Sequence, residues 1–268
     1  MRALSAALLI AAVSGLGARA ETSQQKGKRI IDEAVAALGG QVFLHMRNRV
    51  ESGRIYGFYH GNLSGMDLDT LYTTYLDHPN PPVPGFLGER VRDARGKKQD
   101  DVILYTGDSG YEITYQGARP LADDIVSRFR LGTLSSIFYI LRERLGEPGL
   151  IFDSRGSDFF ENRPIEIVDI IDAKDRTVTV YFDQMNKLPV RQSYERRDPV
   201  DNQRVEEVSI YGKYRDVGGG VMWPFNIRHE RNGDKVFEMF TDNVEINQDL
   251  SDSQFALPPD MKILKKEK

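Results

Sequence analysis

The residues of this chain that could perform metal or acid–base chemistry are scattered along the sequence. Asp100-Asp101 and Asp123-Asp124 are adjacent acidic pairs, but neighbours in a strand point to opposite faces, which favours solvated turn or helix-cap residues over a catalytic pair. The four histidines show no zinc-ligand spacing such as His-Glu-x-x-His. They are His45, His60, His78 and His229. We therefore expect no catalytic residue, no metal, no cofactor and no enzyme activity.

Two glycine-containing runs also favour structural roles. Gly107-Asp108-Ser109-Gly110 matches the tetrapeptide around the nucleophile of trypsin-like proteases, but Tyr111 follows where those proteases have glycine. Strand-like residues on both sides predict a tight hairpin turn. Gly218-Gly219-Gly220 lacks the Lys-Ser/Thr of a phosphate loop and precedes a strand, which predicts a turn or bulge. A hydrolase would need a polar triad, and none is visible in the sequence.

The N-terminus has the pattern of a secretory signal peptide. Met1-Arg2 is a short basic start, residues 3–16 are almost continuously apolar, and Ala18-Arg19-Ala20 has the small-x-small form of a signal-peptidase site. The apolar run is shorter than the roughly 18 residues that cross a bilayer. We therefore expect cleavage after Ala20 and an exported protein with no membrane span. Because no cysteine is present to carry a lipid, the mature protein is expected to be free of a lipid anchor.

Composition excludes further classes of function. The 268 residues include 36 Lys and Arg against 40 Asp and Glu, a formal net charge of −4, and cleavage would remove two arginines but no acid. An acidic chain lacks the basic surface that nucleic acid requires, so no nucleic acid partner is expected. The one basic cluster, at residues 262–268, is interpreted as a solvated tail. With no cysteine, stability must come from apolar burial.

Apolar periodicity predicts a helix, a first series of strands, a helical stretch and a second series of strands. The helix is Ser23–Leu38, where Thr22 and Gln25 fit a capping box and Ile30, Ile31 and Ala34 recur on one face. The helical stretch is Leu121–Leu145, with Gly132 predicted to break or kink it. The strand candidates are Arg54–Tyr59, Thr70–Leu76, Glu89–Arg95, Asp101–Thr106, Tyr111–Tyr115, Ile165–Ile171, Thr177–Phe182, Val190–Arg196, Val205–Tyr214, Met222–Arg231 and Val236–Ile246.

Several of these strands carry apolar side chains on both faces, as in Arg54–Tyr59, where Ile55 and Tyr59 oppose Tyr56 and Phe58. About eleven such strands are too many for a small flat sheet. We expect a mainly β (α+β) protein, in which a strongly curved antiparallel sheet or unclosed β-barrel has helices covering its concave face. Residues 21–268 would form one domain, with a helical insertion at about 121–146.

Segments in the second half of the chain resemble a known superfamily. They are Leu188-Pro189-Val190-Arg191-Gln192, the run from Tyr214-Arg215-Asp216-Val217 through the three glycines to Val221-Met222-Trp223-Pro224, and Val244-Glu245-Ile246-Asn247 followed by Leu250, Asp252, Phe255 and Pro258. These residues are similar to the LolA/LolB-like lipoprotein-carrier superfamily, specifically its outer-membrane lipoprotein-sorting proteins. The helical insertion and the proline-rich segment at 77–85 have no counterpart there.

The resemblance implies an unclosed, curved barrel of about eleven strands that encloses an apolar cavity for acyl chains. It also implies a non-enzymatic periplasmic carrier that shields the acyl chains of lipoproteins or lipids. Such a carrier would take its cargo from an inner-membrane donor to an outer-membrane acceptor. Some members of the fold are instead envelope-stress sensors or protein-interaction modules, and this alternative stays open.

Aromatic and aliphatic side chains are the candidates for a cavity, because the chain contains 13 Phe, 12 Tyr and one Trp. On the helical side the expected contacts are Phe129, Ile137, Phe138 and Leu141, with Gly132 as the hinge of a lid. On the sheet the expected wall residues are Tyr72, Tyr75, Trp223 and Phe225.

Overall fold

The computed structural model describes residues 20–78, 86–199 and 201–266. The predicted signal peptide, apart from Ala20, and most of the proline-rich segment therefore lie outside the described residues. The strands are β1 (Asn48–Tyr59), β2 (Asn62–Tyr75), β3 (Glu89–Arg95), β4 (Asp101–Tyr105), β5 (Gly110–Thr114), β6 (Gly117–Pro120), β7 (Ile151–Phe160), β8 (Arg163–Ile171), β9 (Thr177–Asp183), β10 (Pro189–Arg197), β11 (Arg204–Asp216), β12 (Met222–Arg231) and β13 (Asp234–Ile246).

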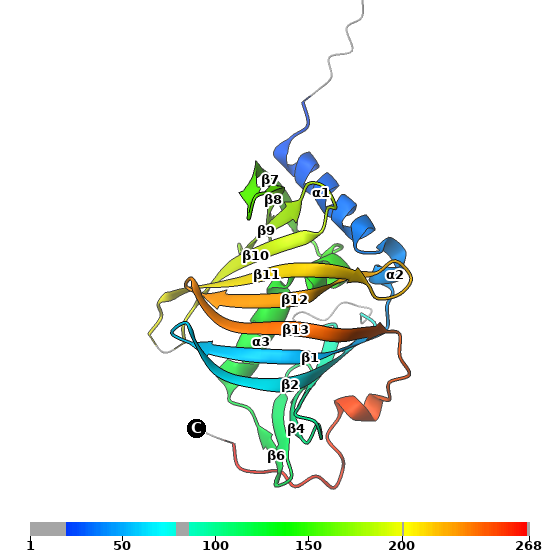
Figure 1. Cartoon of the computed structure of the whole chain (residues 1–268), viewed down its shortest axis with the longest axis vertical. Helices are drawn as coiled ribbons and strands as arrows, with labels where there is room; N and C mark the ends of the chain where they lie inside the picture. The colour runs from blue at the N-terminus through cyan, green and yellow to red at the C-terminus, as the bar shows by residue number, and fades with distance from the viewer. Residues whose placement is uncertain (1–19, 79–85, 200, 267–268) are drawn as a thin grey trace, which may run out of the picture.

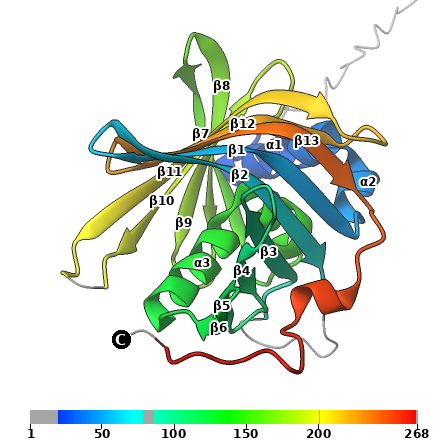
Figure 2. The same cartoon turned by 60° about the horizontal axis from the view of Figure 1, so that its bottom comes forward.

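The strands form one antiparallel sheet of thirteen strands, in the order β6-β5-β4-β3-β2-β1-β13-β12-β11-β10-β9-β8-β7. Every neighbouring pair is consecutive in the chain except β1 and β13, whose pairing runs from Arg49↔Ile246 to Gly57↔Phe237 and joins the two halves. The edge strands β6 and β7 do not pair with each other, so the sheet curves without closing (Figures 1 and 2). The predicted mainly β, curved and unclosed fold is confirmed.

The two strands absent from the prediction are the two edges. β6 has only four residues and includes glycine and proline, and β7 is mostly polar with most of its side chains exposed or half-buried. Neither segment shows the apolar alternation from which the other strands were predicted, because an edge strand buries less side-chain surface.

Helix α1 (Ser23–Ala37) lies against β7 and β8. Thr22 and Gln25 form the predicted capping box, and the buried face includes Ile30, Ile31 and Ala34. A Cβ at Gly27 would lie 2.4 Å from the Phe152 carbonyl oxygen, so this close approach of helix to strand requires glycine. A short helix, α2 (Gly40–Leu44), follows and buries Phe43.

The helical insertion consists of α3 (Asp123–Ser135), α4 (Ile137–Tyr139) and the π-helical turn η1 (Ile140–Arg144). We call these residues, 123–144, the inner helical segment, because α3 lies on the concave side of the sheet (Figures 1 and 2). The predicted break at Gly132 does not occur. Helix α3 continues to Ser135, and the chain leaves helical geometry at Ser136, with φ −67° and ψ 128°.

The break occurs at Ser136 because a side chain of the sheet forms hydrogen bonds with the backbone groups that the break leaves without helical partners. The Ile137 N–H donates to Oε1 of Gln192 at 2.7 Å, and Nε2 of Gln192 donates to the Ser135 carbonyl at 3.1 Å. Gln192 is buried on β10. A glycine inside a helix costs only about 1 kcal/mol relative to alanine, so Gly132 alone does not force a break.

The main apolar core lies between the sheet and the helices α1, α2, α4 and η1. A smaller core cluster of Ala94, Val102 and Leu104 lies under β3 and β4. Among the described residues, no helix is both long and apolar enough to span a bilayer.

The C-terminal residues are not a free solvated tail. Ile263 forms a parallel bridge with Ala118 of β6, in which the Ala118 N–H donates to the Lys262 carbonyl and the Leu264 N–H donates to the Ala118 carbonyl. Lys266 also pairs with Asp123 of α3 at 2.6 Å. The backbone of this segment thus covers the edge of β6, while the side chains of Lys262, Lys265 and Lys266 stay exposed. A short 3₁₀ helix, η2 (Asp252–Phe255), precedes it.

The two glycine-containing runs lie where the sequence predicts turns. Residues 107–109 lie in the turn between β4 and β5, in which the Thr106 N–H donates to the Ser109 carbonyl. Gly218, Gly219 and Gly220 lie between β11 and β12, and all three have positive φ angles, which glycine adopts without strain.

Candidate functional site

A cavity of about 370 Å³ lies between the concave face of the sheet and the inner helical segment. Six adjacent strands, β3, β2, β1, β13, β12 and β11, supply its sheet wall. The helical wall consists of Gly132, Thr133, Ser136, Phe138 and Tyr139. The cavity is therefore formed by the pairing of the two halves of the chain at β1 and β13.

One side of the cavity is apolar. Phe138 packs against Trp223 with ring centroids 4.6 Å apart and against Tyr211 at 5.0 Å. The strands contribute Ile55, Leu71, Ile227, Phe237 and Met239. Because in-facing residues alternate along a strand, Phe237 and Met239 of β13 both face the cavity. Such a surface suits a hydrocarbon chain.

The other side of the cavity is polar, and its first group is centred on Glu51. The Glu51 carboxylate accepts hydrogen bonds from Trp223 Nε1 at 3.2 Å and Thr241 Oγ1 at 2.8 Å, and Arg49 Nε lies 3.4 Å away. The Arg49 guanidinium donates to the Tyr75 hydroxyl at 3.0 Å and lies 4.0 Å from the centre of the Trp223 ring. Glu51 and Arg49 thus neutralise each other inside the wall.

A second polar group lies on β2 and β3. Nη2 of Arg95 donates to Asp93 at 3.0 Å, and these side chains are 39% and 20% exposed, so the cavity reaches solvent here. Asp69 is buried beside them, and its Oδ1 has no hydrogen-bond partner. Burial, and then the neighbouring Asp93 carboxylate, raises the pKa of Asp69 to about 8.

A third polar residue, Glu89, lies at the opposite end of the β2–β3 pair, where it faces Tyr75. Burial raises the pKa of Glu89 to about 7, against the opposing effects of Arg49, Thr133 and Arg142. Arg142 of the inner helical segment lies 3.8 Å from the centre of the Tyr75 ring and donates to the Met46 carbonyl. These contacts join the helices to the sheet at this end of the cavity.

A smaller hollow of about 180 Å³ adjoins the cavity and shares Gly132, Ser136, Tyr211 and His229 with it. Ser209 Oγ and Nδ1 of His229 lie 2.9 Å apart in this hollow, and burial lowers the pKa of His229. The nearby Glu207 carboxylate is bound by Arg196 at 2.8 Å and Arg231 at 3.1 Å. Both arginines bind Oε1 of Glu207, and no hydrogen bond between Glu207 and His229 is found among the described residues, unlike the acid and histidine of a catalytic triad.

The predicted cavity residues separate into two groups. Phe138, Tyr75, Trp223 and Gly132 line the cavity. The others lie elsewhere: Ile137, Leu141 and Phe225 in the main core, Tyr72 in a hydrogen bond with Gln99, and Phe129 stacked on Tyr105 at 3.6 Å. Apolar side chains that fill a core and those that line a cavity have the same sequence pattern, so the sequence could not separate them.

Sequence reasoning missed the polar wall, although one signal was available. Arg49, Glu51, Asp69 and Asp93 lie within strands at positions that alternate with the outward-facing residues, and charged residues at in-facing positions are unusual. No group of three or more acidic or histidine side chains among the described residues is arranged to hold a metal ion.

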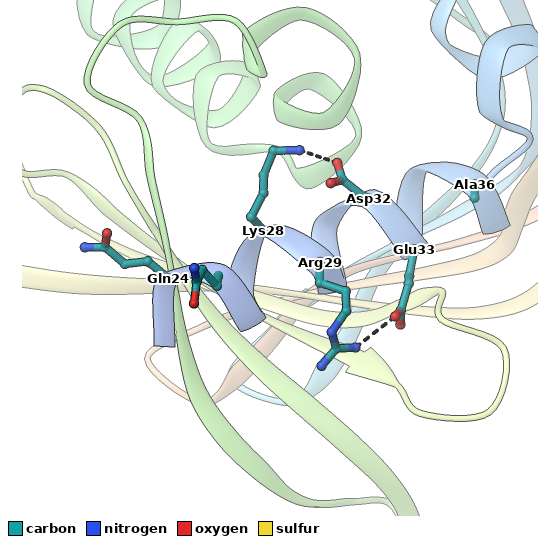
Figure 3. A pocket seen from close by; sticks show the side chains of 7 residues that line it. Gln24, Lys28, Arg29, Asp32, Glu33 and Ala36 are labelled. Carbon is teal, nitrogen blue, oxygen red and sulfur yellow. Dashed lines mark hydrogen bonds and ion pairs between the residues drawn. The ribbon is translucent and has the colours of Figure 1, made fainter. Parts of the chain in front are cut away.

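Another hollow, of about 670 Å³, lies on the outer surface of α1. Figure 3 shows that its labelled side chains are polar apart from Ala36, with Lys28 paired to Asp32 and Arg29 paired to Glu33 at 2.8 Å. These are exposed pairs one helical turn apart, which is typical of a solvated helix face. We assign no binding role to it.

Comparison with known proteins shows which solved structures share this fold. No family model matches the sequence, and no curated protein matches it. Three solved structures, each 12% identical to this chain, have similar folds. A domain named as a candidate outer membrane lipoprotein-sorting protein, from Vibrio parahaemolyticus, has a TM-score of 0.56 and the match covers 87% of this chain and 97% of that one.

The second structure is a DUF1329 family protein from Desulfovibrio piger, with a TM-score of 0.57 and coverage of 88% of this chain and 98% of that one. The third is a LolA superfamily protein from Nitrosomonas europaea, with a TM-score of 0.51 and coverage of 86% and 97%. The likeness is one of fold, and it confirms the LolA-like fold that the sequence motifs predicted.

Proposed function

We propose that residues 21–268 form one LolA-like carrier domain that acts in the periplasm. It shields an acyl chain of a lipoprotein or lipid in the cavity and delivers it from an inner-membrane donor to an outer-membrane acceptor. The observation that supports this most directly is the cavity between the concave sheet and the inner helical segment, with Phe138, Trp223 and Met239 in its apolar wall. The LolA-like fold agrees with it.

The volume and the energetics fit such a ligand. A cavity of about 370 Å³ lies within the range of about 300–1,000 Å³ for small-molecule sites. Each methylene transferred from water to an apolar wall contributes about 0.8 kcal/mol, so ten methylenes contribute roughly 8 kcal/mol before ordering costs are subtracted. Release requires the inner helical segment to move from the sheet, with Gly132 as a proposed hinge.

Filling the cavity tests the proposal. Gly132 lies in α3 at the cavity wall, and a Cβ added there has only the Tyr194 hydroxyl nearby, at 3.6 Å. Gly132→Leu should therefore fold, with improved helix propensity. Because Gly132 lines both the cavity and the adjoining smaller hollow, which Tyr194 also lines, the new side chain should fill space where the two meet. We expect about tenfold weaker binding of a neutral monoacylglycerol with a brominated chain, measured by quenching of Trp223, the only tryptophan.

Gly146→Leu is the matched control. Gly146 follows the inner helical segment, and nothing lies within 4 Å of a Cβ built there, so this variant should bind the probe as the wild type does. Equal binding by both variants and the wild type would contradict an acyl site in this cavity. Mass spectrometry of lipids extracted from the purified protein identifies the cargo, and capture of an envelope protein by a lipid-free form would instead favour the sensor alternative.

A further inference from the structure

The polar wall of the cavity contains one buried carboxylate that has no basic partner. Arg49 pairs with Glu51, and Arg95 pairs with Asp93. Asp69 lies between these two pairs, since its cross-strand partners are Gly53 on β1 and Arg95 on β3. No basic side chain among the described residues lies within 4.0 Å of the Asp69 carboxylate. Glu89 also lines the cavity and forms no ion pair among the described residues, so the wall carries more acidic groups than its own arginines balance.

Asp69 is also deeply buried. The residue is only 7% exposed, it lines the cavity, and its Oδ1 accepts no hydrogen bond. The hydrogen-bonding neighbour of its carboxyl is Asp93, another acid, which cannot neutralise it. A buried carboxylate without a basic partner is costly, so such groups are rare unless they are protonated or a ligand supplies the missing donor. Its raised pKa agrees with this cost. The other charged groups that face it, Glu51, Asp93 and Arg95, are already paired with each other or with Arg49.

The position of Asp69 gives the cavity a polar end and an apolar end. Asp93 and Arg95 beside it reach solvent, whereas Trp223 on the apolar wall is 3% exposed. A molecule with its chain against Trp223 and Phe138 would have its headgroup near Asp69, at the mouth. Only a headgroup that donates hydrogen bonds and carries positive charge satisfies the free oxygen and neutralises the extra acid.

We propose that Asp69 binds a protonated amine on the headgroup of the amphiphile whose chain lies in the cavity, an inference that rests on the proposed function. The Asp69 carboxylate would accept a charge-assisted hydrogen bond from the ammonium group. The cavity would thus prefer amine-bearing amphiphiles to neutral or anionic ones of the same chain length.

Three probes that differ only in headgroup test this proposal. Dodecylammonium, dodecanol and tridecanoate, which all carry a twelve-carbon alkyl chain, are titrated into the purified protein below their aggregation concentrations, with Trp223 emission and calorimetry as readouts. We expect the wild type to bind dodecylammonium about tenfold or more tightly than either other probe. Calorimetry near neutral pH in two buffers of different ionisation enthalpy should show net proton release as Asp69 ionises.

Asp69→Asn keeps the size of the side chain and removes the charge. We expect it to bind dodecanol as the wild type does, to lose about tenfold in affinity for dodecylammonium, and to release no proton. Asp242→Asn is the control, because Asp242 is 59% exposed and lies on β13, two strands away from Asp69 and outside the cavity lining. It should retain the full preference for the amine.

The outcomes separate this inference from the function on which it rests. Equal binding of the three probes by the wild type, or an unchanged amine preference in Asp69→Asn, would overturn the amine site and leave the acyl cavity standing. If none of the probes changes the emission of Trp223, the cavity does not take acyl chains, and both proposals fail.

Discussion

At the scale of single residues, Asp69 links the cavity to the stability of the fold. Burial raises its pKa from 3.8 to about 8, so the folded protein binds this proton more tightly than the unfolded chain does. Stability falls with rising pH wherever the folded state holds more protons. The Asp69 carboxyl therefore destabilises the protein progressively between about pH 4 and pH 8.

The pH dependence of unfolding tests this conclusion. We expect the free energy of unfolding of the wild type, measured with urea, to drop more between pH 5 and pH 8 than that of Asp69→Asn, by on the order of a few kcal/mol. Because Glu89 titrates in both proteins, the difference between their two pH profiles of unfolding free energy reports the titration of Asp69. Asp242→Asn should follow the wild type, and parallel profiles for all three proteins would contradict a buried, uncompensated carboxyl at position 69.

At the scale of elements, the inner helical segment is held to the sheet by polar contacts at defined points. Gln192 binds the backbone at the Ser136 break, the Tyr139 hydroxyl accepts from the Gly88 N–H at 2.7 Å, and Arg144 pairs with Asp172 of the β8–β9 turn at 3.2 Å. These contacts can separate without disturbing the sheet ladder. They are therefore among the contacts that an opening of the cavity would break, together with the packing of Phe138 on Trp223.

Gln192→Ala tests the contribution of the first contact. It leaves the Ile137 N–H and the Ser135 carbonyl buried without their partner, which costs about 1–3 kcal/mol for each group. We expect lower stability and faster hydrogen exchange in α3 and α4, with the sheet less affected. Gln116→Ala, at an exposed turn, should change neither, and unchanged exchange in Gln192→Ala would show that the break is stabilised by other contacts.

The elements differ in how far the sequence predicts them. The capping box of Thr22 and Gln25 and the apolar stripe of Ile30, Ile31 and Ala34 predict α1 correctly, because both signals are local. The break at Ser136 depends on Gln192, which is distant in sequence, and so Gly132 was the wrong choice. The cavity residues were only partly predictable for the same reason. Whether Phe138 or Phe225 faces an empty space is decided by the curvature of the whole sheet.

At the scale of the whole molecule, an unclosed sheet leaves two edges, and one of them is covered by the chain's own C-terminal segment. Lys262, Ile263 and Leu264 run beside β6, and a Cβ at Gly117 would lie 2.4 Å from the Lys262 carbonyl oxygen. Exposed edge strands present unpaired N–H and C=O groups that recruit other chains. This segment therefore protects the molecule from edge-to-edge association.

Removal of residues 261–268 should expose this edge. We expect the truncated protein to self-associate at concentrations where the full chain is monomeric, as measured by light scattering after size-exclusion chromatography. Removal of residues 266–268 alone leaves the bridge at Ala118 and should have no such effect. Equal behaviour of the two truncations would mean that the bridge does not protect the edge.

The pairing of β1 with β13 has a consequence for the timing of biogenesis. Every other strand can find its neighbour soon after it leaves the ribosome, but β1 must wait for almost the entire polypeptide before its second partner exists. At an elongation rate of about 5–20 residues per second, that interval lasts on the order of tens of seconds. The nascent chain thus lacks the ladder that joins its two halves until translation is nearly finished.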